Sequence, residues 1–209
     1  MTMMKKWMTG LIAAVGLSAA VHAQTPAMES PDALVKRLSV DVIDAVKSDK
    51  QIQSGDIQRV TELVDAKILP YTNFQRMTSM AVGRYWRQAT PDQQKRLEQE
   101  FKALLVRTYA GALTQVKDQS VQIRPLRASP QDTDVIVRTQ VLGGGEPIQL
   151  DYRLEKTPAG WKVYDLNVLG VWLVETYRAS FASEISKGGI DGLIATLTER
   201  NKQLAQRKS

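Results

Sequence analysis

The chain has 209 residues, a formal net charge of +6, no cysteine and a single histidine, His22. These counts exclude disulfides, Cys–His catalytic pairs and zinc sites built from several His or Cys ligands. The chain after His22 has no histidine, so Ser–His hydrolase chemistry is also excluded there. At this length a hydrophobic core can hold a fold without disulfides.

The first 23 residues have the pattern of a secretory signal peptide. Lys5 and Lys6 precede a short apolar run, residues 11–21, and Val21-His22-Ala23 fits a cleavage site after Ala23. The run is too short for a bilayer span of about 20 residues. We therefore expect an exported protein with residues 24–209 as one domain. Removing the segment would lower the charge to +4, because it carries two lysines and no acid.

The segment from residue 30 to 113 has helical periodicity. Ser30-Pro31-Asp32 is a cap with proline at the first helical position, Gly55-Asp56 restarts the chain, and Pro70 ends that region. Thr90-Pro91-Asp92-Gln93 is a capping box that opens a long amphipathic helix. The large apolar side chains that we expect to face the interior of the protein from this half are Phe74, Met77, Phe101, Leu105 and Tyr109.

From residue 121 the apolar period changes to two, which predicts strands at 121–123, 135–141, 148–154 and 161–163. Gly143-Gly144-Gly145 is interpreted as a hairpin loop, because no Gly-Lys-Ser/Thr follows it. The pattern predicts an antiparallel meander inside an α+β fold, with a curved sheet packed against N-terminal and C-terminal helices. Its apolar face would carry Val135, Val137, Val141, Ile148, Leu150, Tyr152, Trp161 and Val163, and simple alternation adds Asp165.

The stretch from Val163 to Ile185 changes from strand to helix. One arc of the helix is apolar, with Val171 and Arg178 beside it: Leu173, Val174, Tyr177, Phe181 and Ile185. Two interpretations stay open, a packed core or a cavity, since both need the same lining. Arg178 either pairs with Asp165 or a carbonyl at the junction, or binds a phosphate. The charged segment 199–209 is expected to be a frayed helix end.

Two blocks of this sequence resemble the MlaC family, also called the toluene-tolerance family, of periplasmic phospholipid-binding proteins. The first block contains Gly83-Arg84-Tyr85-Trp86-Arg87, Thr90-Pro91, Phe101, Leu104-Leu105 and Thr108-Tyr109-Ala110. The second contains Tyr164-Asp165-Leu166, Gly170-Val171, Leu173-Val174, Tyr177-Arg178 and Phe181. Trp172 departs from the small polar residue that many members carry.

The resemblance implies a nuclear-transport-factor-like fold with extra helices that encloses an apolar cavity. It implies no catalytic residue, no metal and no cofactor, with bound phospholipid as cargo. Its partners would be an outer-membrane lipoprotein–porin complex and an inner-membrane ATP-binding-cassette transporter with an MCE-domain component, in a shuttle that maintains outer-membrane lipid asymmetry. We expect a monomer, and no nucleic-acid binding, because no Lys/Arg block with interleaved aromatics occurs.

The expected lipid-binding residues are Phe74, Met77, Phe101, Leu105, Tyr109, Val135, Val137, Val141, Ile148, Leu150, Tyr152, Trp161, Val163, Val171, Val174, Tyr177, Arg178 and Phe181. Replacing Val137 or Leu150 by arginine is expected to weaken lipid loading in a folded protein. Two alternatives remain. In one, Asp165 on an apolar face has a raised pKa and acts as the base of a carboxylate-dependent enzyme. In the other, the chain covers apolar segments of client proteins as a chaperone does.

Overall fold

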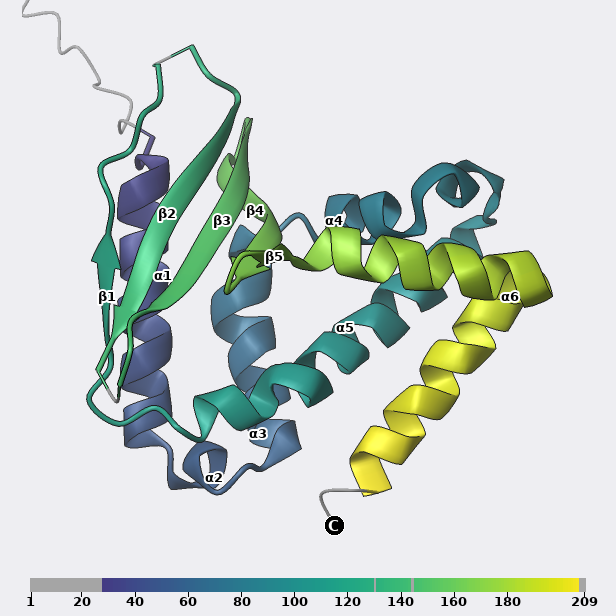
Figure 1. Cartoon of the computed structure of the whole chain (residues 1–209), viewed down its shortest axis with the longest axis horizontal. Helices are drawn as coiled ribbons and strands as arrows, with labels where there is room; N and C mark the ends of the chain where they lie inside the picture. Colours follow the sequence, from purple (N-terminus) through teal and green to yellow (C-terminus); the bar gives the residue numbers. More distant parts are fainter. Residues whose placement is uncertain (1–27, 130, 144, 207–209) are drawn as a thin grey trace, which may run out of the picture.

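A five-stranded antiparallel sheet packs against helices in the computed structural model, which describes residues 28–129, 131–143 and 145–206 (Figure 1). This confirms the predicted α+β class and the order of helices, strands and a final helix. The predicted signal peptide lies outside the described residues. The helical elements are α1 (Pro31–Ser48), α2 (Lys50–Gln53), α3 (Ile57–Leu63), η1 (Val64–Ile68), η2 (Leu69–Tyr71), α4 (Phe74–Val82), η3 (Gly83–Gln88), α5 (Pro91–Leu113) and α6 (Leu173–Gln206). The strands are β1 (Ser120–Ile123), β2 (Asp134–Leu142), β3 (Ile148–Thr157), β4 (Gly160–Val168) and β5 (Val171–Trp172).

The predicted helix starts are confirmed at three positions. Pro31 is the first residue of α1. The Asp56 carboxylate accepts from the amides of Gln58 and Arg59 at the start of α3. The Thr90 capping box at α5 is complete, because its side chain and that of the third helical residue each bond the other's backbone. These bonds satisfy amides that a helix leaves without partners, so the sequence fixes where the helices begin.

The sheet is a meander in which each strand pairs with the next, as predicted. Val141 pairs with Ile148 across the hairpin that follows β2. In that hairpin Gly143 has φ of 104°, and a Cβ there would lie 3.0 Å from the Asp118 carbonyl oxygen. A glycine is therefore needed for both backbone conformation and space.

A β-bulge in β4 changes which side chains share a face. Arg153 pairs with Asp165, whereas the next residue, Leu154, pairs with Val163. Tyr164 is the extra residue, so Asp165 points to the face opposite Val163. The prediction that Asp165 shares the apolar face is therefore wrong, because simple alternation does not allow for the inserted residue.

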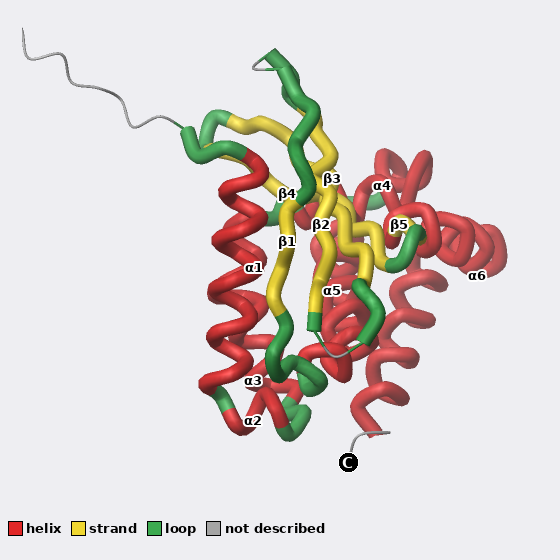
Figure 2. The backbone as a smooth tube through the Cα atoms, turned by 60° about the vertical axis from the view of Figure 1, so that its left-hand side comes forward, coloured by secondary structure: helices red, strands yellow, loops and turns green. Residues whose placement is uncertain are grey.

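Helices attach to the sheet at several places. Helix α1 lies along β1 and β2 (Figure 2). At the start of α4, the Asn73 amide donates to the Val163 carbonyl at 2.8 Å. Further along α4, Arg76 binds Glu155 at 2.6 Å and lies 3.7 Å from the centre of the Tyr164 ring. Helix α6 continues directly from β5 and packs on α4 and α5 (Figure 1).

Buried apolar residues of the described chain gather in three clusters. The helical cluster joins α4, α5 and α6 and includes Met77, Phe101 and Phe181. The sheet cluster joins α1 to β2, β3 and β4. The end cluster joins the last part of α1 with α2, α3 and the C-terminal half of α5. A single contiguous core is more usual for a domain of this size, so the division calls for an explanation.

Helix α6 bends back on itself at Gly189, which has φ of 67° and ψ of −167° (Figure 1). The second arm, residues 190–206, returns along α5. Asn201 in this arm is buried, and its side-chain amide donates to the Glu100 carboxylate at 2.7 Å. The expectation of a frayed end is therefore wrong for residues 199–206, because packing on α5 orders this part of the helix.

Gly189→Ala should destabilise the protein by about 1–3 kcal/mol, because only glycine adopts this backbone conformation without strain. No atom lies within 4 Å of the position a Cβ would take, so the cost would come from the backbone alone. Gly188→Ala is the matched control and should be neutral or stabilising by up to about 1 kcal/mol. Urea unfolding measures both, and equal effects would mean that the bend does not depend on Gly189.

Candidate functional site

All of the predicted apolar sheet residues share one face. The register pairs Val135 with Leu154, Val137 with Tyr152 and Val141 with Ile148. Val168 pairs with both Leu150 and Val171, which places the Val171 side chain of β5 on the same face as Leu150. The predicted residues on this apolar face are Val135, Val137, Val141, Ile148, Leu150, Tyr152, Trp161, Val163 and Val171.

The apolar face is closed at one end and open at the other. Val137 and Leu154 are 0% exposed, because α1 covers them with Leu34 and Val35. The other end, which we call the open end, comprises Val141, Ile148, Leu150 and Val171. Ile148 is 45% exposed and Val171 54%, while Val141 and Leu150 are half-buried. Apolar surface therefore continues beyond the helical cover and is available to a ligand.

The turn between β4 and β5 adds a further exposed apolar side chain to this end. Leu169 is 66% exposed, and its amide donates to the Gln149 carbonyl at 3.1 Å, which holds the turn against β3. Its φ is 53°, a left-handed value that leucine rarely adopts. Gly170 follows with φ of 89°, and its amide donates to the Asn167 side chain. The turn thus keeps a strained, exposed leucine where asparagine would fit better.

Leu169→Asn should raise the free energy of unfolding by about 1 kcal/mol, because asparagine tolerates the left-handed conformation. The exposed leucine side chain loses little packing when it is replaced. Chemical denaturation of the two proteins measures the difference. A drop in stability would show that Leu169 contributes more through contacts than it costs through backbone strain.

The junction of β4 and α6 is held by Asp165, which is 0% exposed. Its carboxylate accepts from the amides of Leu166 and Val174 and from Arg153 at 3.0 Å. The Arg153 guanidinium also lies 3.8 Å from the centre of the Trp172 ring, which gives the unusual tryptophan a packing role. The predicted Asp165–Arg178 pair is wrong, because the bulge turns Asp165 toward Arg153. Arg178 is exposed and lies over Gly83.

Burial raises the pKa of the Asp165 carboxyl, while its backbone hydrogen bonds and Arg153 act to lower it. The direction agrees with the expectation for a buried carboxylate. However, both oxygens already accept hydrogen bonds within the junction. Asp165 is therefore arranged to join a strand to a helix, and this geometry gives no support to its use as a catalytic base.

The aromatic members of the predicted helix residues form a group inside the helical cluster. This aromatic group consists of Phe74, Phe101, Tyr177 and Phe181. The Phe101 ring centre lies 4.9 Å from that of Tyr177, 5.2 Å from Phe181 and 5.8 Å from Phe74. Met77 and Val174 are buried beside them, and Leu105 packs against the cluster. The predicted set is thus divided between two clusters, since the valines of the closed end belong to the sheet cluster. Tyr109 on α5 is 39% exposed.

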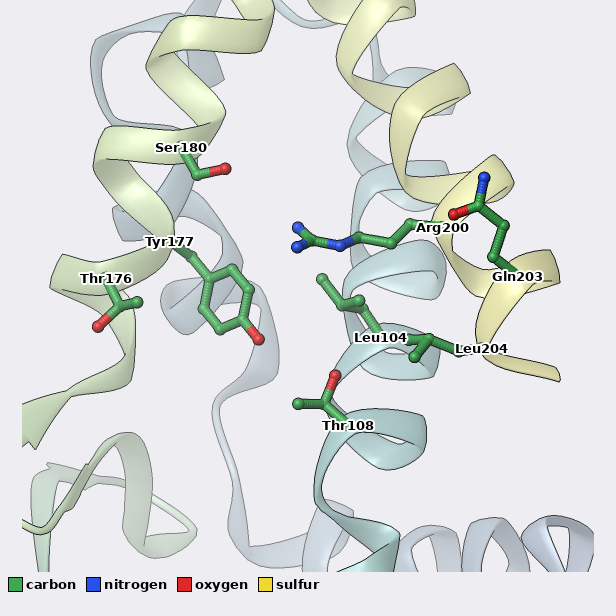
Figure 3. A pocket seen from close by; sticks show the side chains of 8 residues that line it. All are labelled: Leu104, Thr108, Thr176, Tyr177, Ser180, Arg200, Gln203 and Leu204. Atoms are coloured by element: carbon green, nitrogen blue, oxygen red, sulfur yellow. The ribbon is translucent and has the colours of Figure 1, made fainter. Parts of the chain in front are cut away.

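A pocket of about 530 Å³ lies between α5 and the two arms of α6 (Figure 3). Tyr177 is the residue it shares with the predicted set, and burial raises the pKa of its hydroxyl, which stays protonated at neutral pH. In Figure 3 the Arg200 guanidinium points into the space between the helices. The lining residues are Leu104, Thr108, Thr176, Tyr177, Ser180, Arg200, Gln203 and Leu204.

Sequence reasoning missed the C-terminal side of this pocket. Arg200, Gln203 and Leu204 fall in the segment that was interpreted as a frayed tail. A signal was present, because an apolar stripe at helical spacing continues past residue 199. Its members, all buried or half-buried, are Leu193, Ile194, Leu197 and Leu204.

Two kinds of feature do not occur among the described residues. Within them, no cluster of three or more His, Cys, Asp or Glu side chains is placed to hold a metal ion. No helix in the same part of the chain combines the length and the apolar character that crossing a membrane requires. The exposed apolar side chains, the ring contacts and the pocket give a candidate site made of the open end of the sheet, the aromatic group and the pocket.

A family model described as MlaC protein matches residues 36–199. The chain belongs to the MlaC family. Among curated relatives in the family, it is 26% identical over 205 residues to the intermembrane phospholipid transport system binding protein MlaC of Haemophilus influenzae, covering 96% of this chain and 95% of that protein. It is 23% identical over 176 residues to the toluene tolerance protein ttg2D of Pseudomonas putida, covering 84% and 82%.

A solved structure is similar to this MlaC-family chain in both sequence and fold. It is the phospholipid-binding protein of Ralstonia solanacearum, solved in complex with a phospholipid, with 52% sequence identity and a TM-score of 0.82. The match covers 83% of this chain and 98% of that one. The arrangement of sheet and helices described above is therefore shared with that phospholipid-bound protein.

Proposed function

We propose that this chain binds a phospholipid and carries it across the periplasm between the two membranes. The observation that carries the proposal is the similarity to the Ralstonia solanacearum protein, which was solved with a phospholipid bound. The names of the two curated relatives, from intermembrane phospholipid transport and toluene tolerance, support the same function. A periplasmic location agrees with the signal-peptide pattern of residues 1–23.

The apolar surface suits this task for a physical reason. A diacyl phospholipid has on the order of 30 tail methylenes, each costing about 0.8 kcal/mol in water. Moving the tails through water unaided would cost roughly 25 kcal/mol. A carrier needs a lining about as apolar as the bilayer, so that loading and release are nearly balanced. Such a lining tolerates different chain lengths, which predicts weak selectivity for the tails.

We assign the tails to the open end of the sheet, at Val141, Ile148, Leu150 and Val171, because these apolar side chains keep exposed surface. Leu105, Tyr109 and Tyr177 would face the tails from the helices. The buried members of the predicted set then shape the walls and make no direct contact with lipid. They are Met77, Phe101, Val135, Val137, Val163, Val174 and Phe181, with the half-buried Phe74 beside them.

The transport step in this proposal is exchange inside a docked complex, without a chemical reaction. The partners are an inner-membrane ATP-binding-cassette transporter with its MCE-domain component and an outer-membrane lipoprotein–porin complex. Lipid would pass directly between apolar surfaces, which avoids the cost of exposing the tails. Transfer assays with each partner complex would give the direction of transport.

The first experiment is a solvent extract of the purified protein analysed by mass spectrometry. We expect about one phospholipid per chain, with mixed tail lengths. Bound peptide in place of lipid would favour the chaperone alternative. A lipid-free protein that also refuses added phospholipid would overturn the proposal.

A further inference from the structure

The pocket between α5 and the arms of α6 has a lining that tail binding does not explain. Its polar members outnumber its leucines, and none of the eight lining residues is acidic. Arg200 enters from the second arm of α6, where the Gln203 amide is turned away from the space, and Tyr177 and Ser180 come from the first arm (Figure 3). Thr108 enters from α5. Donors therefore approach one space from three helical segments.

Arg200 is a cation without an anionic partner. Its side chain is exposed, and within residues 28–206, apart from 130 and 144, it makes no ion pair; other exposed arginines, Arg178 among them, also make none, so its position at the pocket is what distinguishes it. On α5 the Glu100 carboxylate accepts from Thr198 and Asn201 and makes no ion pair with Arg200. A guanidinium that points into a pocket free of carboxylates is placed to meet an anion from outside the chain.

The arrangement fits a phosphate better than a carboxylate. A phosphate is tetrahedral and presents several oxygens, so it can accept from donors that come from different sides. A planar carboxylate accepts best from donors that lie near its own plane, which suits donors from several sides less well. Leu104 and Leu204 supply apolar surface next to the donors. Tyr177 links the pocket to the aromatic group, because its ring lies 4.9 Å from that of Phe101.

We propose that this pocket binds a phosphate group, with Arg200 as its cation and the hydroxyls of Thr108, Tyr177 and Ser180 as further donors. The inference rests on the proposed function where the phosphate is that of the cargo headgroup. A free phosphate ion is the other source of the same chemistry. In the headgroup case the lipid is oriented, with its phosphate between the arms of α6 and its tails toward the apolar clusters.

The test compares three probes on the delipidated full chain by titration calorimetry. They are dihexanoyl phosphatidylglycerol, the matched dihexanoylglycerol without phosphate, and inorganic phosphate. Arg200→Gln should raise the Kd for the phospholipid about tenfold, as expected for a lost charge-assisted hydrogen bond. It should leave the Kd for dihexanoylglycerol within about twofold, because that probe has no group for Arg200 to bind. Arg200→Lys keeps the charge, so its Kd for the phospholipid should lie between the Kd of wild type and that of Arg200→Gln.

Lys202→Gln is the matched control, because Lys202 is an exposed cation on the same arm that does not line the pocket. It should leave all three constants unchanged. If Arg200→Gln weakens the phospholipid and dihexanoylglycerol equally, or changes none of the constants, the proposal is overturned. Thermal unfolding of each variant identifies any loss of fold.

The probes also separate the two sources of phosphate. Arg200-dependent binding of the phospholipid supports the headgroup. Arg200-dependent binding of inorganic phosphate, with phospholipid affinity unaffected, supports a free ion. If the wild-type chain binds inorganic phosphate but neither lipid, the phosphate pocket stands and the proposed lipid-carrier function fails.

Discussion

Leu150→Arg should give a folded protein that carries little phospholipid. Leu150 is half-buried at the open end of the apolar face, where an arginine can reach water while its charge lies among the tails. Burying a charge against methylenes costs several kcal/mol, so we expect lipid occupancy to fall by at least about tenfold. Mass spectrometry of the solvent extract measures the occupancy, and circular dichroism checks the fold.

Gln149→Arg is the control for this variant. Gln149 is adjacent in β3, exposed, and on the opposite face of the sheet. It should retain its lipid. Full occupancy in folded Leu150→Arg would mean that the tails do not lie on the open end.

Val137→Arg now has a different expected outcome. Val137 is 0% exposed in the sheet cluster, packed under α1. An arginine there has no route to water, so we expect the protein to unfold rather than to lose lipid selectively. Sequence alone placed Val137 and Leu150 on the same face, but it did not show where α1 stops covering that face.

Asp165→Ala should destabilise the protein by about 3–5 kcal/mol, the usual cost of breaking a buried ion pair from one side. The change leaves the amides of Leu166 and Val174 and the Arg153 guanidinium without their acceptor. Urea unfolding gives the magnitude. A loss below about 1 kcal/mol would show that water replaces the carboxylate at low cost.

Asp165→Asn tests the pKa of the same group. Burial raises the folded-state pKa of Asp165, so the folded protein binds this proton more tightly than the unfolded chain. The stability that wild type gains from the group is therefore fully present below the unfolded pKa and is lost as the pH rises through the folded pKa. The free energy of unfolding of wild type minus that of Asp165→Asn should therefore decrease as the pH rises from below the unfolded-state pKa, about 3.9, through the raised folded-state pKa. A difference that grows with pH would mean that Arg153 outweighs burial.

The sequence was sufficient to predict most of the fold, because its local signals agree with the packing. The Thr90 box and Pro31 set helix starts, and strict alternation in β2 and β3 fixed which valines share a face. The prediction from sequence was wrong where one inserted residue changes which side chains lie on the same face of the sheet. The bulge at Tyr164 turned Asp165 away from the apolar face, and nothing in the pattern of polar and apolar residues marks that insertion.

The candidate site was harder to predict than the fold. Leu150 and Val137 have the same character in sequence, and their different exposure follows from the position of α1. Arg200 is exposed, as its charge suggested, and it was missed because the sequence does not show that the bend at Gly189 brings it back along α5 (Figure 1). Both depend on tertiary arrangement, which the period of an isolated segment does not contain.

The division of the apolar interior into three clusters has a consequence for the lifetime of the carrier. A lipid that lies between the sheet and helical clusters would add contacts that the chain lacks on its own, and its binding would stabilise the folded state by mass action. The empty carrier would then open more often and be the form that proteases degrade. The amount of carrier would follow the supply of cargo, without a separate regulator.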